Sequence, residues 1–269
     1  WKRWSKMYLP MLATEAEAAF DSPEYIFEPK WDGYRALYYT KLGEIRSRRG
    51  KSLTETFRHL TKTSIDEAVI DGELVSFASG RPDFASLRKN PQTAVLMAFD
   101  LLSVGGRDVT KLPLESRKEI LKELIQGQHL IGFSPDYSDG IKLFAALKDA
   151  GWEGIVAKRK GSVYRPGERS SDWLKIVAYK EIDAVVLEVI KERGTALLGL
   201  FRGGHLEPVG HVPLSRYADL EQKGPQVVTV RYREYTGKAF RHARFVRTRE
   251  DKSPWECTYE QLVQPHKPR

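Results

Sequence analysis

The fold of this chain depends on one short stretch, Glu28-Pro29-Lys30-Trp31-Asp32-Gly33-Tyr34-Arg35. The segments 25–27 and 36–39 on either side are rich in aromatic and β-branched residues, so we predict the two strands of a hairpin. Gly33 can adopt the backbone angles that a tight reversal needs. Lys30 then lies between apolar strands, where desolvation and neighbouring cations would lower its pKa and make its amine a nucleophile. The alternative is a charged hairpin in which Lys30 pairs with Asp32.

The composition sets broad limits on the class of protein. The chain has 269 residues, of which 41% are hydrophobic, enough for one large domain or two modest ones. It contains no run of about 18 apolar residues, so we expect no transmembrane helix. Cys257 is the only cysteine, which excludes an internal disulfide and a cysteine-based zinc site and is typical of a reducing cytosol. The net charge of +8 favours a polyanionic partner, with nucleic acid as the first candidate.

Three further segments place charged or aromatic residues where they could serve a site. Arg48 and Arg49 stand in a basic cluster, and guanidinium groups suit phosphate binding, although a solvated loop is the simpler alternative. Glu73 lies in the Asp-Gly-Glu-Leu segment 71–74, and its hard carboxylate oxygens suit Mg²⁺, whereas a turn at a strand edge is the alternative. Phe99 lies in a continuous apolar run that predicts a buried strand, where an ordinary core residue is the simpler interpretation.

The segment 153–176 is the most informative part of the chain. Glu153 begins one predicted strand that carries Lys158 near its end, and a second predicted strand carries Lys175. Two lysines and a glutamate that project from neighbouring strands make a site for a phosphate and a divalent cation. The alternative is a pair of ordinary edge strands with outward lysines.

Other elements follow from periodicity and turn signals. Helices are predicted over residues 14–20, 54–60, 113–125 and 141–150. The segment 67–77 predicts two strand segments around Gly72.

The pattern changes after a predicted domain junction at 179–183. Five short strands are predicted over 184–190, 196–201, 208–212, 227–232 and 239–246, with one helix over 214–220. This order indicates an OB-fold barrel or another small β-barrel. Residues 231–249 carry seven positive charges against one negative charge, with interleaved aromatics, which suits a nucleic-acid surface. A strand with a solvated basic face is the alternative.

Six motifs together resemble a known superfamily, and they lie at 30–35, 47–50, 71–74, 153–158, 172–176 and 249–252. The Lys-x-Asp-Gly-x-Arg pattern at 30–35 resembles motif I of the covalent nucleotidyltransferases, namely DNA ligases, RNA ligases and mRNA capping enzymes. The joined run 153–176, which contains Tyr-Arg-Pro-Gly and Asp-Trp-Leu-Lys, resembles ATP-dependent DNA ligases rather than capping enzymes. The chain is similar to the ligase module of bacterial non-homologous end-joining enzymes.

The resemblance implies a two-domain α+β architecture. Residues 1–180 would form a nucleotidyltransferase (adenylation) domain of ATP-grasp-like antiparallel sheets with helices, and residues 181–269 a small all-β OB-fold barrel. NAD-dependent ligases carry a nicotinamide-binding domain and a cysteine zinc finger, whereas this chain has about 29 residues before Lys30 and a single cysteine. We therefore expect ATP as the nucleotide donor, with Mg²⁺, or alternatively Mn²⁺, as the metal.

The resemblance also implies a role for each motif residue. Lys30 would attack the α-phosphate of ATP. Around the nucleotide, Glu28 would place it, Phe99 would stack on adenine, and Lys158 and Lys175 would contact the α-phosphate. Glu73 and Glu153 would bind the metal, and Arg35, Arg48 and Arg49 would bind the DNA or the nick phosphate. Arg249, Asp251 and Lys252 would act during lysine adenylation.

One position departs from the family pattern, and three other functions stay open. Val177 stands two residues after Lys175, where the family has a second lysine; either Lys180 substitutes for it or Lys175 acts alone. The alternatives are an RNA ligase, an mRNA capping-type nucleotidyltransferase, or a non-catalytic DNA-end-binding module that kept the fold. The expected partner is nicked double-stranded DNA, with DNA-repair proteins or flanking domains as further candidates. We expect a monomer without membrane attachment in the bacterial cytosol or nucleoid.

Overall fold

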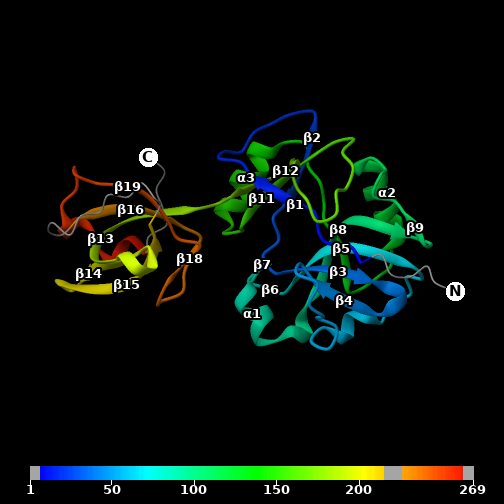
Figure 1. Cartoon of the computed structure of the whole chain (residues 1–269), viewed down its shortest axis with the longest axis horizontal. Helices are drawn as coiled ribbons and strands as arrows, with labels where there is room; N and C mark the ends of the chain where they lie inside the picture. Colours follow the sequence, from blue (N-terminus) through cyan, green and yellow to red (C-terminus); the bar gives the residue numbers. More distant parts are fainter. Residues whose placement is uncertain (1–6, 215–225, 263–269) are drawn as a thin grey trace. The chain divides into compact units, whose positions relative to one another are not determined.

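The computed structural model describes residues 7–214 and 226–262 and divides the chain into two compact units, Trp1–Ala178 and Tyr179–Arg269 (Figure 1). Both units are built mostly from strands, and the described helices are few and short. No helix in these ranges is both long and apolar enough to cross a membrane.

The first unit contains two main sheets. The four-stranded sheet has the order β1-β12-β11-β2, formed by Leu12–Glu15, Arg169–Val177, Gly154–Arg159 and Tyr25–Pro29. The larger sheet has the order β10-β8-β5-β3-β4, formed by Ile131–Phe133, Val95–Val104, Ala68–Val75, Tyr34–Tyr39 and Glu44–Ser47. Strand β9 (Arg107–Asp108) also pairs with β8, and β6 (Phe77–Ala78) pairs with β7 (Arg81–Pro82). Pairs β1–β12 and β8–β10 are parallel, whereas the other named pairs are antiparallel.

Three α-helices belong to this unit: α1 (Phe84–Lys89), α2 (Leu114–Leu124) and α3 (Gly140–Asp149). Helix α2 packs on β8, and α3 packs on β11 and β2. Asp139 caps α3 by accepting a hydrogen bond from the Lys142 backbone N–H at 2.8 Å, as short polar side chains do at helix starts.

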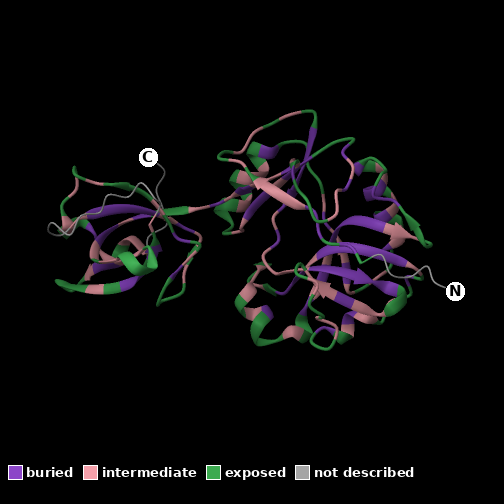
Figure 2. Ribbon diagram, viewed as in Figure 1, coloured by how far each residue is buried: buried purple, intermediate pink, exposed green. Residues whose placement is uncertain are grey.

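The two sheets face each other across a shared apolar layer. Side chains alternate along a strand, so β8 directs Leu96 and Ala98 to one core and Phe99 to another. The second core also contains Leu37 of β3 and Trp173 of β12, which belong to different sheets. Buried residues line these strands in Figure 2. Polar side chains between the sheets are therefore shielded from bulk water.

The second unit has its own sheet and core. Its five strands run in the order β15-β14-β13-β16-β19, formed by His205–Pro213, Thr195–Arg202, Lys180–Ile190, Val227–Tyr232 and Arg244–Thr248. A separate pair is formed by β17 (Glu234–Tyr235) and β18 (Phe240–Arg241). All of these pairs are antiparallel.

The predicted lysine hairpin is wrong. Strand β2 belongs to the four-stranded sheet and β3 to the larger sheet, so the motif at 30–35 carries the chain from one sheet to the other. Gly33 is required here because a Cβ atom would lie 1.9 Å from the Leu74 carbonyl oxygen. Lack of space, rather than a tight reversal, therefore selects glycine at this position.

Several predicted boundaries also differ from the structure. The predicted helix over 14–20 is wrong, because Leu12–Glu15 forms a strand paired with β12. The predicted helix over 54–60 is also wrong, since only a 3-10 turn, Arg58–Thr61, forms there. Ala68–Val75 forms one continuous strand, β5, that runs through Gly72 with an irregularity at Asp71/Gly72, and Phe77 starts the short strand β6. The strand predicted over 239–246 is interrupted near His242, whose φ is 52°. The helix predicted over 214–220 lies, apart from Leu214, outside the described residues.

The remaining predicted helices are confirmed. Helices α2 and α3 match the predictions over 113–125 and 141–150 to within about two residues. The strands predicted around Lys158, Lys175 and Phe99 also form, as β11, β12 and β8.

Candidate active site

Lys30 and Glu153 meet at the end of the four-stranded sheet. Strand β2 ends at Pro29, and β11 starts at Gly154 and pairs antiparallel with β2. The Lys30 backbone N–H donates to the Gly154 carbonyl at 2.9 Å, and Lys30 Nζ lies 2.7 Å from Glu153 Oε1. The two side chains are 24% and 14% exposed, so the amine is neither in open solvent nor sealed from substrate.

Glu73 contributes a second carboxyl group to this end of the site. It lies on β5 opposite Arg35 of β3, in an antiparallel register. Burial raises the pKa of Glu73 to about 8, Lys30 and Arg35 oppose that rise, and the neighbouring Glu153 carboxylate adds to it. Glu73, Glu153 and Lys30 are therefore close enough to influence one another electrostatically.

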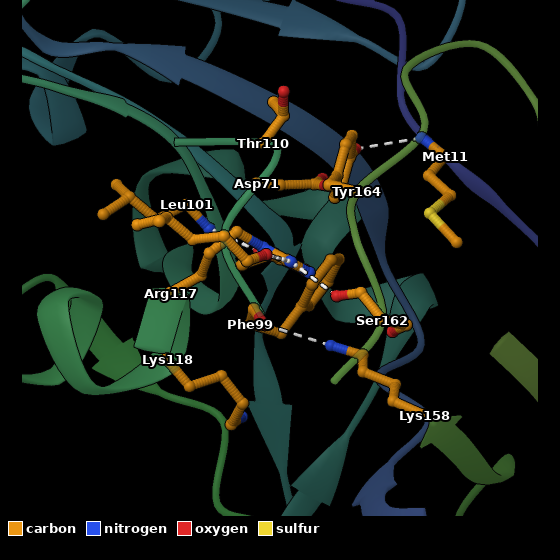
Figure 3. A network of polar contacts seen from close by, with 12 residues as sticks. Met11, Asp71, Phe99, Leu101, Thr110, Arg117, Lys118, Lys158, Ser162 and Tyr164 are labelled. Atoms are coloured by element: carbon orange, nitrogen blue, oxygen red, sulfur yellow. Dashed lines mark hydrogen bonds and ion pairs between the residues drawn. The ribbon is translucent and has the colours of Figure 1, made fainter. Parts of the chain in front are cut away.

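Arg35 is held inside the unit by a buried carboxylate. Its Nε and Nη2 atoms donate to both oxygens of Asp71 at 2.8 and 2.7 Å, and Nη2 also donates to the Met11 carbonyl at 3.0 Å. The Tyr164 hydroxyl donates to Asp71 Oδ2 at 2.6 Å and accepts from the Met11 N–H at 2.9 Å (Figure 3). These bonds fix Arg35, so its predicted contact with a nick phosphate would use the part of the guanidinium that Asp71 does not occupy.

A second polar group surrounds Glu28, deep between the sheets. Lys158 Nζ lies 3.0 Å from Glu28 Oε1 and donates to the Phe99 carbonyl at 3.0 Å (Figure 3). The same ammonium lies 4.6 Å from the centroid of the Phe99 ring and 4.4 Å from that of Trp173, distances typical of cation–π contacts. Burial lowers the pKa of Lys158, and the Glu28 carboxylate opposes that fall. The structure thus groups Lys158 with Glu28 and Phe99, and its contact with the α-phosphate stays a prediction.

Lys175 lies on the same face of the four-stranded sheet. Val156 of β11 stands opposite both Glu28 and Lys175, and Lys158 stands opposite Trp173. Directly opposed residues share a face, and side chains alternate along each strand, so Glu28, Lys158 and Lys175 all lie on the face away from α3. Lys175 Nζ pairs with Glu15 Oε2 at 3.2 Å and stays about one-third exposed.

Val177 lies two residues beyond Lys175 on this face. It is half-buried and stands opposite Gly154, next to Glu153. A lysine at this position would therefore place a further positive charge near Lys30 and Glu153.

Arg48 and Arg49 follow β4, in which Ser47 stands opposite Ala36, the residue after Arg35. Both are exposed in the turn after β4. Both cations are therefore accessible from solvent.

The three predicted residues near the C-terminus cluster within the second unit. Arg249 donates from Nε and Nη2 to both oxygens of Asp251 at 2.8 Å. Arg249 and Lys252 also reach one oxygen of Asp183, at 2.9 and 2.7 Å. The hydrogen bond from Arg249 lowers the pKa of Asp251 to about 2.

The sequence prediction missed Lys118 and Ser134. Lys118 of α2 is 6% exposed, and its Nζ lies 2.6 Å from Glu28 Oε1, while the Ser134 hydroxyl donates to Glu28 Oε2 at 3.1 Å. Ser134 Oγ also accepts from Trp31 Nε1 at 2.9 Å, which links this group to the residue after Lys30. A signal was available, because Lys118 lies at i+4 from Leu114 on the buried face of the helix.

The fold and this arrangement point to one class of protein. Between two sheets, a lysine paired with a glutamate lies next to a buried polar and aromatic group. A family model described as "ATP dependent DNA ligase domain" matches residues 10–176. The chain therefore belongs to the ATP-dependent DNA ligase family.

Two relatives and one solved structure show how similar the chain is to known DNA ligases. The multifunctional non-homologous end joining protein LigD of Mycolicibacterium smegmatis is 33% identical over 189 residues, which are 66% of this chain and 25% of that protein. DNA ligase C1 of the same organism is 28% identical, covering 95% of this chain and 94% of that protein. A solved mycobacterial DNA ligase D complexed with ATP and MES has a TM-score of 0.62 and 28% identity, covering 93% of this chain and 98% of that chain. The chain spans only a quarter of the length of LigD.

Proposed function

We propose that this chain is an ATP-dependent DNA ligase that seals nicks in duplex DNA through a lysyl-AMP intermediate on Lys30 and a DNA-adenylate. The observation that carries the proposal is the Lys30–Glu153 pair at 2.7 Å, next to Glu73 and open in part to solvent. A structural ion pair has no need of a second carboxyl group with a raised pKa, whereas such perturbed groups gather at functional sites.

The first step joins AMP to the chain. The Lys30 nitrogen forms a bond to the α-phosphorus of ATP, the bond to the bridging oxygen breaks, pyrophosphate leaves with the electron pair, and the amine loses a proton to solvent. AMP then passes to the 5′-phosphate of the nick, and the 3′-hydroxyl displaces it. Each step is a displacement at phosphorus, so the protein mainly orients groups and neutralises charge.

The Glu28 group is proposed to hold the adenine. Phe99 supplies a ring for stacking, and the contacts of Lys158 with Glu28 and Phe99 support a role for its ammonium at this end of the site. Lys118 and Ser134 orient the Glu28 carboxylate. Lys175, which lies on the same face and is partly exposed, is a candidate for the α-phosphate.

Glu73 and Glu153 fit a divalent cation. The described residues contain no group of three or more metal-ligating side chains. Mg²⁺, or Mn²⁺ in its place, is commonly held by one or two carboxylates together with substrate phosphates and water. When bound, the ion would neutralise charge on the phosphates, and a cation would also stabilise the ionised form of Glu73.

The same proposal assigns a role to each of the two units. The first unit would be the adenylation domain, with sheets arranged as in ATP-grasp-like folds. The second unit, a five-stranded antiparallel sheet with its own core, would be an OB-fold domain. Arg35, Arg48 and Arg49 are the proposed contacts to nicked DNA. We also propose a monomer that works in the bacterial cytosol or nucleoid, with DNA-repair proteins or flanking domains as further partners.

One assay separates this function from its rivals. Nicked duplex DNA is incubated with the chain, Mg²⁺ and either ATP, GTP or NAD. We expect sealing with ATP alone. Labelling by GTP would indicate a capping-type enzyme, preference for an RNA 3′-hydroxyl strand would indicate an RNA ligase, and binding to the nick without sealing would indicate a non-catalytic module.

A further inference from the structure

Asp183 brings together the two cations that the sequence places in lysine adenylation. It lies on β13, and its Oδ2 accepts from Arg249 Nη1 at 2.9 Å and from Lys252 Nζ at 2.7 Å. Its other oxygen accepts from the Thr229 hydroxyl at 2.5 Å. All three charged side chains are 12–15% exposed.

The backbone at Asp183 is fixed from the other side of the strand. The Asp183 N–H donates to Gln261 Oε1 at 3.4 Å, and Gln261 Nε2 donates to the Asp183 carbonyl at 3.2 Å. These bonds tie β13 to the turn Tyr259–Leu262 near the C-terminus. The carboxylate is thus a fixed point in the unit, while arginine and lysine side chains are long and otherwise free to rotate.

We propose that Asp183 is a positioning residue for lysine adenylation, which holds the Arg249 guanidinium and the Lys252 ammonium as a preformed pair of cations for the β- and γ-phosphates of ATP. This inference rests on the proposed ligase function. Charged groups that are oriented before the reaction need no reorganisation when charge develops on the departing pyrophosphate. The Asp183 carboxylate accepts from both cations and from Thr229, so its orientation fixes the positions of both cationic groups.

The proposed role of Asp183 concerns one step of the reaction only. Pyrophosphate leaves only in the first step, when Lys30 gains AMP. A nick that already carries AMP on its 5′-phosphate needs no ATP and releases no pyrophosphate. Loss of Asp183 should therefore slow the first step and spare the last.

The test compares Asp183→Asn with the wild-type chain in both steps. Adenylation is followed with labelled ATP and Mg²⁺, and the last step with a pre-adenylated nick in the absence of ATP. We expect kcat/KM for adenylation to fall by about 10- to 100-fold, as when other groups that orient a functional side chain are removed. Sealing of the pre-adenylated nick should stay within about twofold of wild type.

Glu188→Gln is the matched control, because Glu188 is exposed on the same strand and the variant removes the same charge. It should leave both steps unchanged. Unchanged adenylation in Asp183→Asn, or an equal loss in both steps, would overturn the proposal, since the second result indicates a purely structural role. Absence of any adduct in the wild-type chain would instead refute the ligase function itself.

Discussion

Lys30 Nζ lies 2.7 Å from Glu153 Oε1, and this ion pair joins the residue that follows β2 to the residue that precedes β11. The paired strands fix both backbones, so the pair does not depend on flexible loops. A nucleophile and a carboxylate held in this way are oriented before substrate arrives.

Glu153→Ala should remove most of the metal-dependent adenylation. The variant deletes one of the two carboxylates proposed to hold the cation and frees Lys30 to move. We expect the adenylation rate at saturating ATP to fall by about 100-fold or more, as when a group that stabilises charge in the transition state is removed. Glu168→Ala is the control, since Glu168 is exposed and outside the site. A wild-type rate with Mg²⁺ in Glu153→Ala would exclude Glu153 from the site.

Lys118→Met should weaken ATP binding and lower stability together. The variant leaves the Glu28 carboxylate, which is 3% exposed, without the ammonium at 2.6 Å. Removing the only partner of a buried charge costs about 3 kcal/mol of unfolding free energy, and the loss here should be smaller because Lys158 stays 3.0 Å from Glu28. Denaturant unfolding and the KM for ATP measure the two effects. Lys122→Met, at an exposed position of the same helix, should change neither value, and equal behaviour of both variants would remove Lys118 from the nucleotide site.

Val177→Lys should improve the use of ATP. The new ammonium would lie on the same face as Lys175 and opposite Gly154, next to Glu153. A partly exposed ion pair contributes about 0.7 kcal/mol, so the KM for ATP in adenylation should fall about threefold. Val177→Met controls for side-chain length. If Val177→Lys and Val177→Met give the same KM, the absent lysine has no effect on nucleotide binding.

Cys257 should report the folding of the second unit. It is fully buried, and burial raises the pKa of its thiol to about 11. The reactive thiolate therefore stays scarce between pH 7 and 9 in the folded unit, whereas in the unfolded chain it grows as pH approaches the ordinary value of about 8.5. A thiol reagent should label the native chain slowly across this pH range and the denatured chain rapidly. Rapid labelling of the native chain at pH 8 would contradict the packing around Cys257.

Local signals in the sequence predicted the strands around the site, but they did not predict which sheet each strand joins. Aromatic and β-branched residues predicted strands on both sides of Lys30, yet the assignment of β2 and β3 to different sheets depends on contacts with β11 and β5, far away in sequence. The acidic start of 14–20 favoured a helix, but Thr14 pairs with Leu174 of β12, and this tertiary contact outweighs helix propensity.

The motif residues were easier to find than their neighbours. Lys30 and Glu153 stand in short patterns whose chemistry can be recognised without a structure. The helical position of Lys118 indicates burial but not its partner, which appears when α2 is packed near Glu28. Asp183 has no such pattern, and its importance appears when β13 lies beside the residues that follow β19. For Lys158, the sequence predicted the position in a strand but did not predict the partners, Glu28 and Phe99.

The most direct test of the account is the covalent adduct on Lys30. The chain is incubated with ATP labelled on the α-phosphate and with Mg²⁺, then denatured and examined for a bound label that is labile to acid and stable to alkali, as expected of a phosphoramidate. We expect a labelled wild-type chain and an unlabelled Lys30→Ala variant, and the variant should keep the wild-type unfolding transition. An undiminished adduct in Lys30→Ala would contradict the assignment of the nucleophile.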